Sequence, residues 1–342
     1  MIFSGIYEEE GYPFTGRKLE KLKAFLADAG LSYDDTVEYS LNLVDEEDRI
    51  AATGSVAGGV LKCIAVSDAY RGEGLSARIV TGLVRHAMEK GFSHLFLFTK
   101  PKNQQMFEDL GFYRIIATED ILLMENRKGG IEEYVRSLKG AAEPLLHTVC
   151  AASEGNIVQG AVVANCNPFT SGHRYLIEEA LKRCDMLHLF ILSEDRSEFS
   201  AAQRYDMARR GTSDLPRVIL HPTSDYLISS ATFPTYFIKD KARAEDARCE
   251  LDVRIFAECF AIPMGITKRF AGSEPEDVVT HAYNEAMAGI LPGYGIEFVE
   301  VPRLLSADGR PVSAKTVRKL LSEGKTEEAG MLLPESTKEA LA

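Results

Sequence analysis

The spacing of apolar and polar residues predicts two parts of the chain with different architecture. In the first part, short apolar runs between turn residues predict strands, and apolar residues at intervals of three and four predict helices. The expected strands lie at 39–44, 50–55, 60–66 and 95–98, and the expected helices at 19–29, 75–90 and 103–110. The acidic run 45–48 is expected to form a hairpin turn between the first two strands.

The second part alternates strands with helices of about ten residues. The expected strands lie at 160–164, 186–192 and 217–221, and the helices between them at 173–181 and 200–210. This alternation predicts a parallel α/β sheet. Ligands of such sheets bind beyond the carboxyl ends of the strands, so we expect a site at that edge.

The boundary between the two parts is expected near residue 130. A short helix at 131–138 lies between the breakers Gly129-Gly130 and 140–144. We therefore predict a first domain at 1–130, a connector at 131–155 and a second domain at 156–342.

Composition narrows the range of functions. The 342 residues carry a formal net charge of −12, which argues against nucleic-acid binding because phosphate neutralisation needs clustered lysine and arginine. The six cysteines form no C-x-x-C pair and have no ligand spacing with histidine, so reduced thiols are expected. The sequence has neither a signal-peptide pattern nor an apolar run long enough to span a bilayer, which predicts a cytoplasmic protein without a membrane partner.

The expected strand at 160–164 runs into the sequence N-C-N-P-F-T-S-G-H. Pro168 predicts a turn, Gly172 allows the backbone to approach a ligand, and His173 opens a helix. A helix N-terminus after such a turn presents free N–H groups and the positive end of the helix dipole, which suits a phosphate. The alternative is a surface turn in which Thr170 caps the helix.

The T-x-G-H string resembles the first signature of the HIGH nucleotidyltransferase superfamily, whose turn holds the phosphates of ATP. The second signature of that superfamily, I-S-S-T-x-x-R, resembles residues 312–318, with departures at Ala314 and Lys315. These departures leave open whether Ser313 or Thr316 touches the nucleotide. A C-terminal helix with a capped start is the alternative.

The superfamily resemblance implies a set of ATP-binding residues. Between the signatures, residues 268–275 resemble the loop that holds adenosine. The implied ATP-binding residues are Asn167, Pro168, Phe169, Thr170, Gly172, His173, Arg269, Gly272, Ser313, Thr316 and Arg318. Among them Arg318 suits bidentate contact with phosphate oxygens, and the neighbouring Lys315 could also reach a phosphate.

A glycine-rich turn also follows the expected strand at 60–66. It reads R-G-E-G-L, and it removes side chains where backbone amides can point at a pyrophosphate. With the helix at 103–110 and the G-F-Y that follows it, this order resembles the acetyl-CoA-dependent N-acetyltransferase (GNAT) fold over roughly residues 1–125. The resemblance implies that a CoA-like arm binds to Arg71, Gly72, Glu73, Gly74 and Leu75. His86 and His94 are expected to be structural.

Together these features resemble one family, the citrate lyase ligases, over nearly the whole chain. The segments 226–240 and 275–287 contribute to the resemblance. The implied fold class is α/β, with a GNAT-like α+β N-terminal domain followed by a Rossmann-like parallel-sheet nucleotidyltransferase domain. The implied reaction adenylates acetate with ATP and passes acetyl to the thiol of the citrate lyase acyl carrier protein, whose prosthetic group derives from dephospho-CoA.

The family resemblance also assigns roles to residues. His173, Lys315 and Arg318 would act at the α-phosphate, with Mg²⁺ bridging phosphates and no metal site made by protein side chains alone. The segment 226–240 mixes small polar residues with Phe and Tyr, which suits a small, partly apolar pocket, so we expect an acetate pocket that contains Ser229, Ser230, Thr232 and Phe233. The alternative is an ordinary loop and edge helix. One alternative is a CoA-dependent N-acetyltransferase with a nucleotide-binding regulatory domain, and another is a CoA-binding regulatory module without catalysis.

Overall fold

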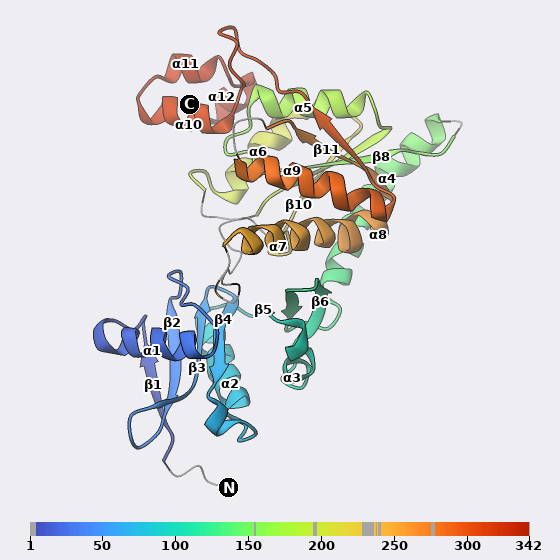
Figure 1. Cartoon of the computed structure of the whole chain (residues 1–342). Coiled ribbons are helices and arrows are strands. Elements are labelled where there is room, and N and C mark those ends of the chain that lie inside the picture. The colour runs from blue at the N-terminus through green and yellow to red at the C-terminus, as the bar shows by residue number, and fades with distance from the viewer. Residues whose placement is uncertain are drawn as a thin grey trace. The chain divides into compact units, whose positions relative to one another are not determined.

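The computed structural model describes residues 5–153, 155–193, 197–227, 236, 238, 241–274 and 278–341. The chain divides into two compact units, Met1–Gly130 with Phe233–Leu251, and Ile131–Thr232 with Asp252–Ala342. The first unit therefore takes up a segment that lies far along the chain, which the sequence did not predict. Figure 1 labels the helices and strands of both units.

The first unit is built on a seven-stranded sheet in the order β1-β2-β3-β4-β5-β7-β6. The strands are β1 Tyr7–Gly11, β2 Tyr39–Val44, β3 Ile50–Ala57, β4 Val60–Val66, β5 Phe96–Thr99, β6 Tyr113–Ala117 and β7 Leu122–Glu125. The helices are α1 Gly16–Asp28, α2 Leu75–Glu89 and α3 Gln104–Glu108, with short 3₁₀ turns η1 Asp68–Tyr70 and η2 Pro101–Asn103. Neighbouring strands are antiparallel except β4 and β5, which are parallel. The four predicted strands are present, and β1, β6 and β7 were not predicted.

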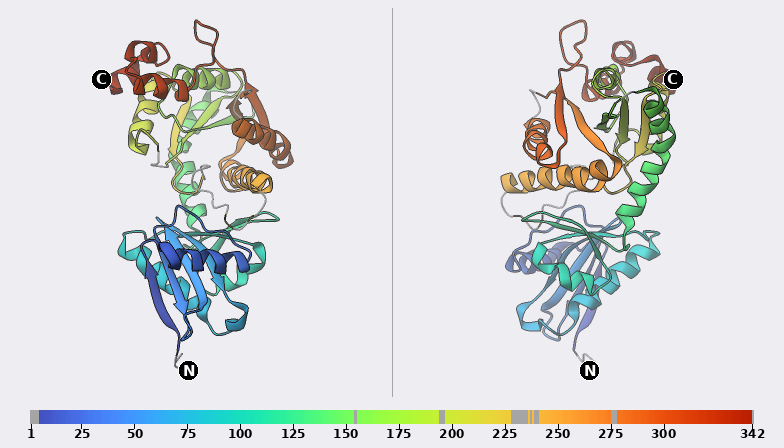
Figure 2. Two further views of the ribbon diagram at one scale, coloured as in Figure 1. Left: turned by 60° about the vertical axis from the view of Figure 1, so that its left-hand side comes forward. Right: turned by 90° about the vertical axis from the view of Figure 1, so that its right-hand side faces the viewer.

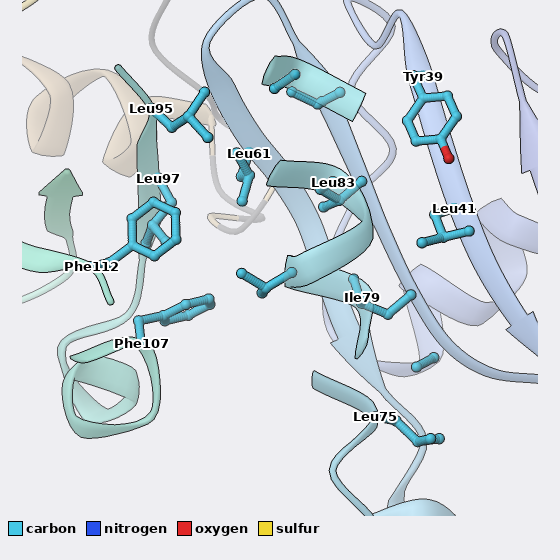
Figure 3. Packing of buried hydrophobic residues seen from close by; sticks show 14 of the residues in the cluster. Tyr39, Leu41, Leu61, Leu75, Ile79, Leu83, Leu95, Leu97, Phe107 and Phe112 are labelled. Atoms are coloured by element: carbon cyan, nitrogen blue, oxygen red, sulfur yellow. The ribbon is translucent and has the colours of Figure 1, made fainter. Parts of the chain in front are cut away.

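Helix α2 packs closely on this sheet. Figure 3 shows its side chains Leu75, Ile79 and Leu83 among apolar residues of the strands and of the α3 region. The backbones approach so closely that a Cβ on Gly54 would lie 2.5 Å from Cγ2 of Ile79. The glycine in β3 therefore fixes how near α2 comes to the sheet, because any side chain there would push the helix away.

The second unit is built on a five-stranded sheet in the order β10-β9-β8-β11-β12, and every neighbouring pair is parallel. The strands are β8 Gln159–Ala164, β9 Met186–Ile191, β10 Val218–Pro222, β11 Ile266–Gly272 and β12 Glu297–Val301. The larger helices are α4 Gly130–Ala152, α5 Ser171–Leu181, α6 Ala201–Gly211, α9 Val278–Ile290 and α10 Ala314–Ser322. Helix α7 Lys241–Arg254 begins in the segment that belongs to the first unit and ends in the second. Shorter elements are the π-helix η3 Ile255–Ala261, α8 Ile262–Met264, η4 Leu291–Tyr294, α11 Thr326–Gly330 and α12 Glu335–Leu341. The predicted parallel α/β sheet is confirmed.

Helices cover both faces of the second sheet, as Figure 2 shows from two sides. On one face α5 and α6 pack against Val162 and Phe270 in the larger apolar core of this unit. On the other face the rings of Phe256 and Phe260 from η3 meet Phe190 of β9 edge-on. A sheet covered on both sides exposes its carboxyl edge, where loops can form a site.

The order of strands creates a switch point at that edge. From β8 the chain proceeds to β9 and β10 on one side and later to β11 and β12 on the other. The connections leaving β8 and β11 therefore turn in opposite directions and leave a crevice between the ends of these two strands.

The prediction of a short helix in the connector at 131–155 is wrong. Residues 131–155 were predicted to contain a short helix stopped at 140–144, but α4 runs without interruption from Gly130 to Ala152. Pro144 lies inside it, although proline removes one helical hydrogen bond. The helix continues because its apolar face is buried, with Ala142 and Val149 against Met186 of β9.

Candidate functional site

A cavity of about 430 Å³ lies at the switch point of the second unit. It is lined by the ends of β8 and β11, the first turns of α5 and α10, one side of α9, and the segment after β12. Of the expected ATP-binding residues, those that line it are Thr170, Gly172, His173, Arg269, Gly272 and Ser313.

The turn between β8 and α5 is held by reciprocal hydrogen bonds. The hydroxyl oxygen of Thr170 accepts from the backbone N–H of His173 over 3.4 Å, and Nδ1 of His173 accepts from the backbone N–H of Thr170 over 3.0 Å. Thr170 therefore caps α5 and also lines the cavity onto which this helix opens.

These bonds fix the protonation of His173. Because the N–H of Thr170 can only donate, Nδ1 carries no hydrogen and the neutral ring carries its hydrogen on Nε2. Burial, and next the positive charge of Arg303, lower the pKa of His173 to about 4. The ring is thus neutral near pH 7 and has one N–H donor to offer a ligand.

Two helix N-termini converge on the cavity. Thr170 caps α5, and Ser313 caps α10 by accepting from the backbone N–H of Thr316 over 3.1 Å. Gly172 allows the two ends to approach, because a Cβ there would lie 2.9 Å from the carbonyl oxygen of Val312. Free N–H groups and dipoles from two helices make this edge favourable for an anion.

Two arginines also line the cavity, and they differ in their partners. Arg303 donates from Nε to the carbonyl of Ser273 over 2.8 Å and pairs with Glu274. Arg269 is 4% exposed, and its Nη1 has no hydrogen-bond partner among the residues that the structure describes. Sequence reasoning missed Arg303, although a charged residue directly after the apolar end of a strand was an available signal.

The other predicted phosphate ligands lie elsewhere. Lys315 is exposed on α10, and Arg318 donates from Nη1 to the backbone carbonyl of Asn167 over 2.5 Å. Oδ1 of Asn167 accepts from the N–H of Phe199 over 3.2 Å. Within the described part of the chain, the cavity-lining residues do not include Asn167, Pro168, Phe169, Lys315, Thr316 or Arg318.

The structure also bears on the segments expected to hold adenosine and acetate. The adenosine-binding loop expected at 268–275 is largely a strand, because Lys268 to Gly272 belong to β11 and pair with β8 and β12. Only the end of this segment can reach a ligand as a loop. The predicted acetate-pocket residues Ser229, Ser230, Thr232 and Phe233 lie outside the described residues.

A buried arginine fixes the carboxyl edge beside the cavity. Arg204 of α6 is fully buried, and its Nη1 donates to the carbonyl oxygens of Asn165 over 2.9 Å and Leu192 over 2.6 Å. These two residues follow β8 and β9, so one guanidinium satisfies carbonyls at the ends of both strands.

The first unit has its own cavity, of about 530 Å³, between β4 and β5. These strands pair only at Val60 with Phe96 and Leu61 with Leu97, and then diverge. Of the expected CoA-arm residues, those that line the cavity are Arg71, Gly72, Gly74 and Leu75.

The glycines of that turn have a backbone conformation that favours glycine. Gly72 and Gly74 have φ values of 84° and 76°, and Gly74 caps the N-terminus of α2. Lys100 and Lys102 also line the cavity and were not identified from the sequence. A turn of amides beside lysines suits a pyrophosphate.

Tyr236 lies at the same cavity, although the sequence placed it in the second domain. Its hydroxyl donates to the carbonyl of Phe98 over 3.1 Å, and its own carbonyl accepts from the N–H of Ser32 over 2.6 Å. The side chain therefore forms part of the wall of the cavity at β5.

The two histidines of this unit have structural partners. His86 stacks on Tyr39 with ring centroids 3.7 Å apart, and Nε2 of His94 lies 2.7 Å from a carboxylate oxygen of Glu125. The residues described as lining the cavity of this unit include neither histidine.

Comparison with known proteins relates each half of the chain to a protein family. Residues 159–341 match the family described as "Citrate lyase ligase C-terminal domain", and residues 18–112 match "Acetyltransferase (GNAT) family". The [Citrate [pro-3S]-lyase] ligase of Escherichia coli K12 is 38% identical over 327 residues, which cover 94% of this chain and 89% of that protein. The [Citrate [pro-3S]-lyase] ligase of Klebsiella pneumoniae is 39% identical, covering 93% of this chain and 91% of that protein.

The chain belongs to the citrate lyase ligase family. The predicted fold class, a GNAT-like domain followed by a parallel-sheet α/β domain, is confirmed. A solved structure of Thermotoga maritima TmcAL bound with alpha-thio ATP matches 54% of this chain and 55% of that chain, with a TM-score of 0.37 and 18% identity. Among the described helices of this family member, none is long and apolar enough to cross a membrane.

Proposed function

We propose that the protein is an ATP-dependent acid–thiol ligase that adenylates acetate and transfers acetyl to the thiol of the citrate lyase acyl carrier protein. AMP and diphosphate leave in the process, and the reaction takes place in the cytoplasm. Family membership supports the proposal, and the observation that carries it is the convergence of two helix N-termini and a neutral histidine on one cavity.

The chemistry explains why such a cavity is needed. A carboxylate condenses with a thiol only when one of its oxygens becomes a good leaving group, which AMP provides. The protein must then position the acid oxygen against the α-phosphate and stabilise the charge that develops there. Nε2–H of His173 and the first amides of α5 and α10 are donors of the required kind.

The remaining proposed residues act at different places. Arg318 positions the phosphate turn through the carbonyl of Asn167. Exposed Lys315 extends from the first turn of α10, where it can reach a triphosphate that projects from the cavity. The described residues contain no group of three or more His, Cys, Asp or Glu side chains that could hold a metal. We propose that Mg²⁺ enters bound to the phosphates of ATP, whose oxygens are ligands of the kind that this ion prefers.

The first unit is proposed to receive the prosthetic arm of the carrier. Its cavity of about 530 Å³ has a glycine turn, a helix N-terminus and lysines at one end, where a pyrophosphate would bind. The rest of the cavity is a slot between two diverging strands, which suits a narrow chain. A dephospho-CoA-derived arm has both of these parts.

A diphosphate-release assay tests the function. Purified protein with Mg·ATP and acetate should release diphosphate, and acetylated carrier should accumulate with one AMP for each acetyl group transferred. A protein that consumes acetyl-CoA without releasing diphosphate would instead be the N-acetyltransferase alternative. Binding of CoA with neither reaction would indicate the regulatory module.

A further inference from the structure

Among the cations that the structure describes in the second unit, Arg269 is distinguished by being both buried and incompletely paired. It is 4% exposed, and its Nη1 has no hydrogen-bond partner within the described residues. Arginine stays protonated in proteins, so a positive charge with an open N–H lies inside the structure. Buried polar groups of this kind usually meet a partner, and Arg269 lines the cavity in which a ligand could supply one.

The surroundings of Arg269 restrict what that partner can be. Its guanidinium lies over the ring of Phe256, 4.6 Å from the ring centroid, and Phe256 in turn packs edge-on against Phe190. Ala271 follows on the same face of β11, and Met287 of α9 also lines the cavity. The arginine therefore lies between these apolar side chains and the polar side chains of Asp252 and Tyr283, of which Tyr283 is also its hydrogen-bond partner.

The depth of Arg269 separates it from the phosphate turn. In the register of the sheet Arg269 is paired with Ala161, which lies three residues before the end of β8 at Ala164. His173 and the amides of α5 lie beyond that end. The cavity thus has a rim with donors from two helix N-termini and a deeper part in which Arg269 lies with Ala271, Tyr283 and Met287.

We infer that Arg269 binds the carboxylate of the acid substrate, a small monocarboxylate, through Nη1 in the deeper part of the cavity. The inference rests on the proposed function and deepens it. One open N–H of a guanidinium beside apolar side chains matches one carboxylate with a short alkyl tail, whereas a triphosphate needs the donors at the rim. From this position the second carboxylate oxygen faces the rim, where the α-phosphate would lie. The family resemblance placed Arg269 at the nucleotide, and the geometry points to the acid instead.

The test is acetate-dependent exchange of labelled diphosphate into ATP, measured for the wild type, Arg269→Gln and Arg269→Lys. Arg269→Gln should raise the KM for acetate by about 10²-fold, the scale of one lost hydrogen bond to a charged group, and leave the KM for ATP unchanged. Arg269→Lys keeps the charge without the planar fork, so its KM for acetate should lie between those of the wild type and Arg269→Gln. Calorimetry of acetate with a non-hydrolysable ATP analogue present should show the same order of affinities.

Lys268→Gln is the matched control, because Lys268 is the preceding cation on β11, lies on the opposite face of the sheet and pairs with Glu297 at 3.1 Å. It should leave the KM for acetate unchanged. An unchanged KM for acetate in Arg269→Gln, or a rise confined to ATP, would overturn the inference while leaving the proposed function intact. Loss of ATP binding in both Arg269 variants would assign the residue to the nucleotide or to the fold and would also overturn it. A wild type without acetate-dependent exchange would remove the proposed function and the inference together.

Discussion

Arg318 donates a hydrogen bond from Nη1 to the backbone carbonyl of Asn167, with 2.5 Å between the two atoms. The residues are 151 positions apart in the sequence and belong to the two signatures recognised there. The arginine of the second signature therefore holds the turn of the first, and Glu198 lies 3.8 Å from its Nε. This hydrogen bond from the guanidinium of Arg318 to a backbone carbonyl positions the turn that presents His173.

Arg318→Gln should reduce adenylylation mainly through positioning. The variant removes the donor that holds the carbonyl of Asn167, so the turn and His173 lose their fixed geometry. We expect a loss of kcat of about 10- to 100-fold, with a smaller effect on the KM for acetate. Diphosphate-release kinetics would measure both quantities. A selective rise in the KM for ATP would instead mean that Arg318 leaves the carbonyl and binds phosphate, as the sequence resemblance implied.

His173→Ala should lower adenylylation by at least about 10²-fold, the effect of losing one donor to the transition state. His173→Asn is the matched variant, because its side-chain oxygen can still accept from the N–H of Thr170 and keep the turn capped. Both variants should be folded and should release diphosphate at least about 10²-fold more slowly than the wild type. Full activity in His173→Asn would show that the histidine serves only as a cap.

The parallel sheet and the phosphate turn could be predicted because their signals are local. An apolar run before N-P-F-T-x-G-H places strand, turn and helix in order, and Thr170 is a recognisable cap. The strand β1 reads Y-E-E-E-G and was missed because its stability comes from pairing with β2 rather than from its own side chains. The residues at 140–144 do not end α4 as predicted, because burial of one face of the helix stabilises it by more than Pro144 destabilises it.

The deeper parts of both sites depend on long-range packing that local patterns do not contain. Arg269 is unusual only because Phe256 covers it and the cavity opens beside it. Tyr236 belongs to the first unit because its hydroxyl bonds Phe98, 138 positions away. Arg318 resembled a phosphate ligand in sequence, and only the fold reveals that it reaches a backbone carbonyl.

The buried histidines His188 and His221 should make the second unit sensitive to acid. His188 Nε2 lies 3.0 Å from Oε1 of Gln159 and therefore donates to it, so its Nδ1 accepts from Nε2 of His221 over 2.9 Å. Burial lowers the pKa of His188 to about 3 and that of His221 to about 4. Both rings then stay neutral in the folded state where an unfolded chain would bind protons, so stability is complete above about pH 6.5 and falls as the pH drops towards 4.

Urea unfolding at pH 7 and pH 5 measures this effect. Each buried histidine should contribute about 2 kcal/mol to the loss of unfolding free energy between the two pH values. The double variant His188→Gln/His221→Gln should flatten the dependence whatever its absolute stability. His147→Gln, a change at an exposed histidine, should leave the dependence as it is in the wild type. An equally steep loss in the double variant would mean that other groups cause the acid sensitivity.

Gly172→Ala should separate the two helix ends that meet at the cavity. The added Cβ would lie 2.9 Å from the carbonyl oxygen of Val312, a backbone atom that cannot move without shifting the start of α10. We expect weaker ATP binding, measured by calorimetry with a non-hydrolysable analogue. Gly140→Ala in α4, where nothing lies within 4 Å of the new Cβ, is the control and should stabilise the protein by about 0.5–1 kcal/mol. Unchanged affinity in Gly172→Ala would show that the helix ends need not approach so closely.

Gly74→Val should separate the two halves of the reaction. Gly74 has a φ of 76° at the start of α2, a conformation that valine rarely adopts, so the turn that faces the first-unit cavity must change shape. Acetyl-adenylate formation depends on the second unit and should continue, as measured by acetate-dependent diphosphate exchange. Acetyl transfer to the carrier thiol should fall, because the arm loses its pyrophosphate site.

Gly91→Val is the matched control, since Gly91 has a φ of 91° just beyond the other end of α2 and bears the same strain away from the cavity. If both variants lose transfer equally, strain in the first unit explains the effect. If Gly74→Val transfers acetyl at the wild-type rate, the arm does not bind at this turn.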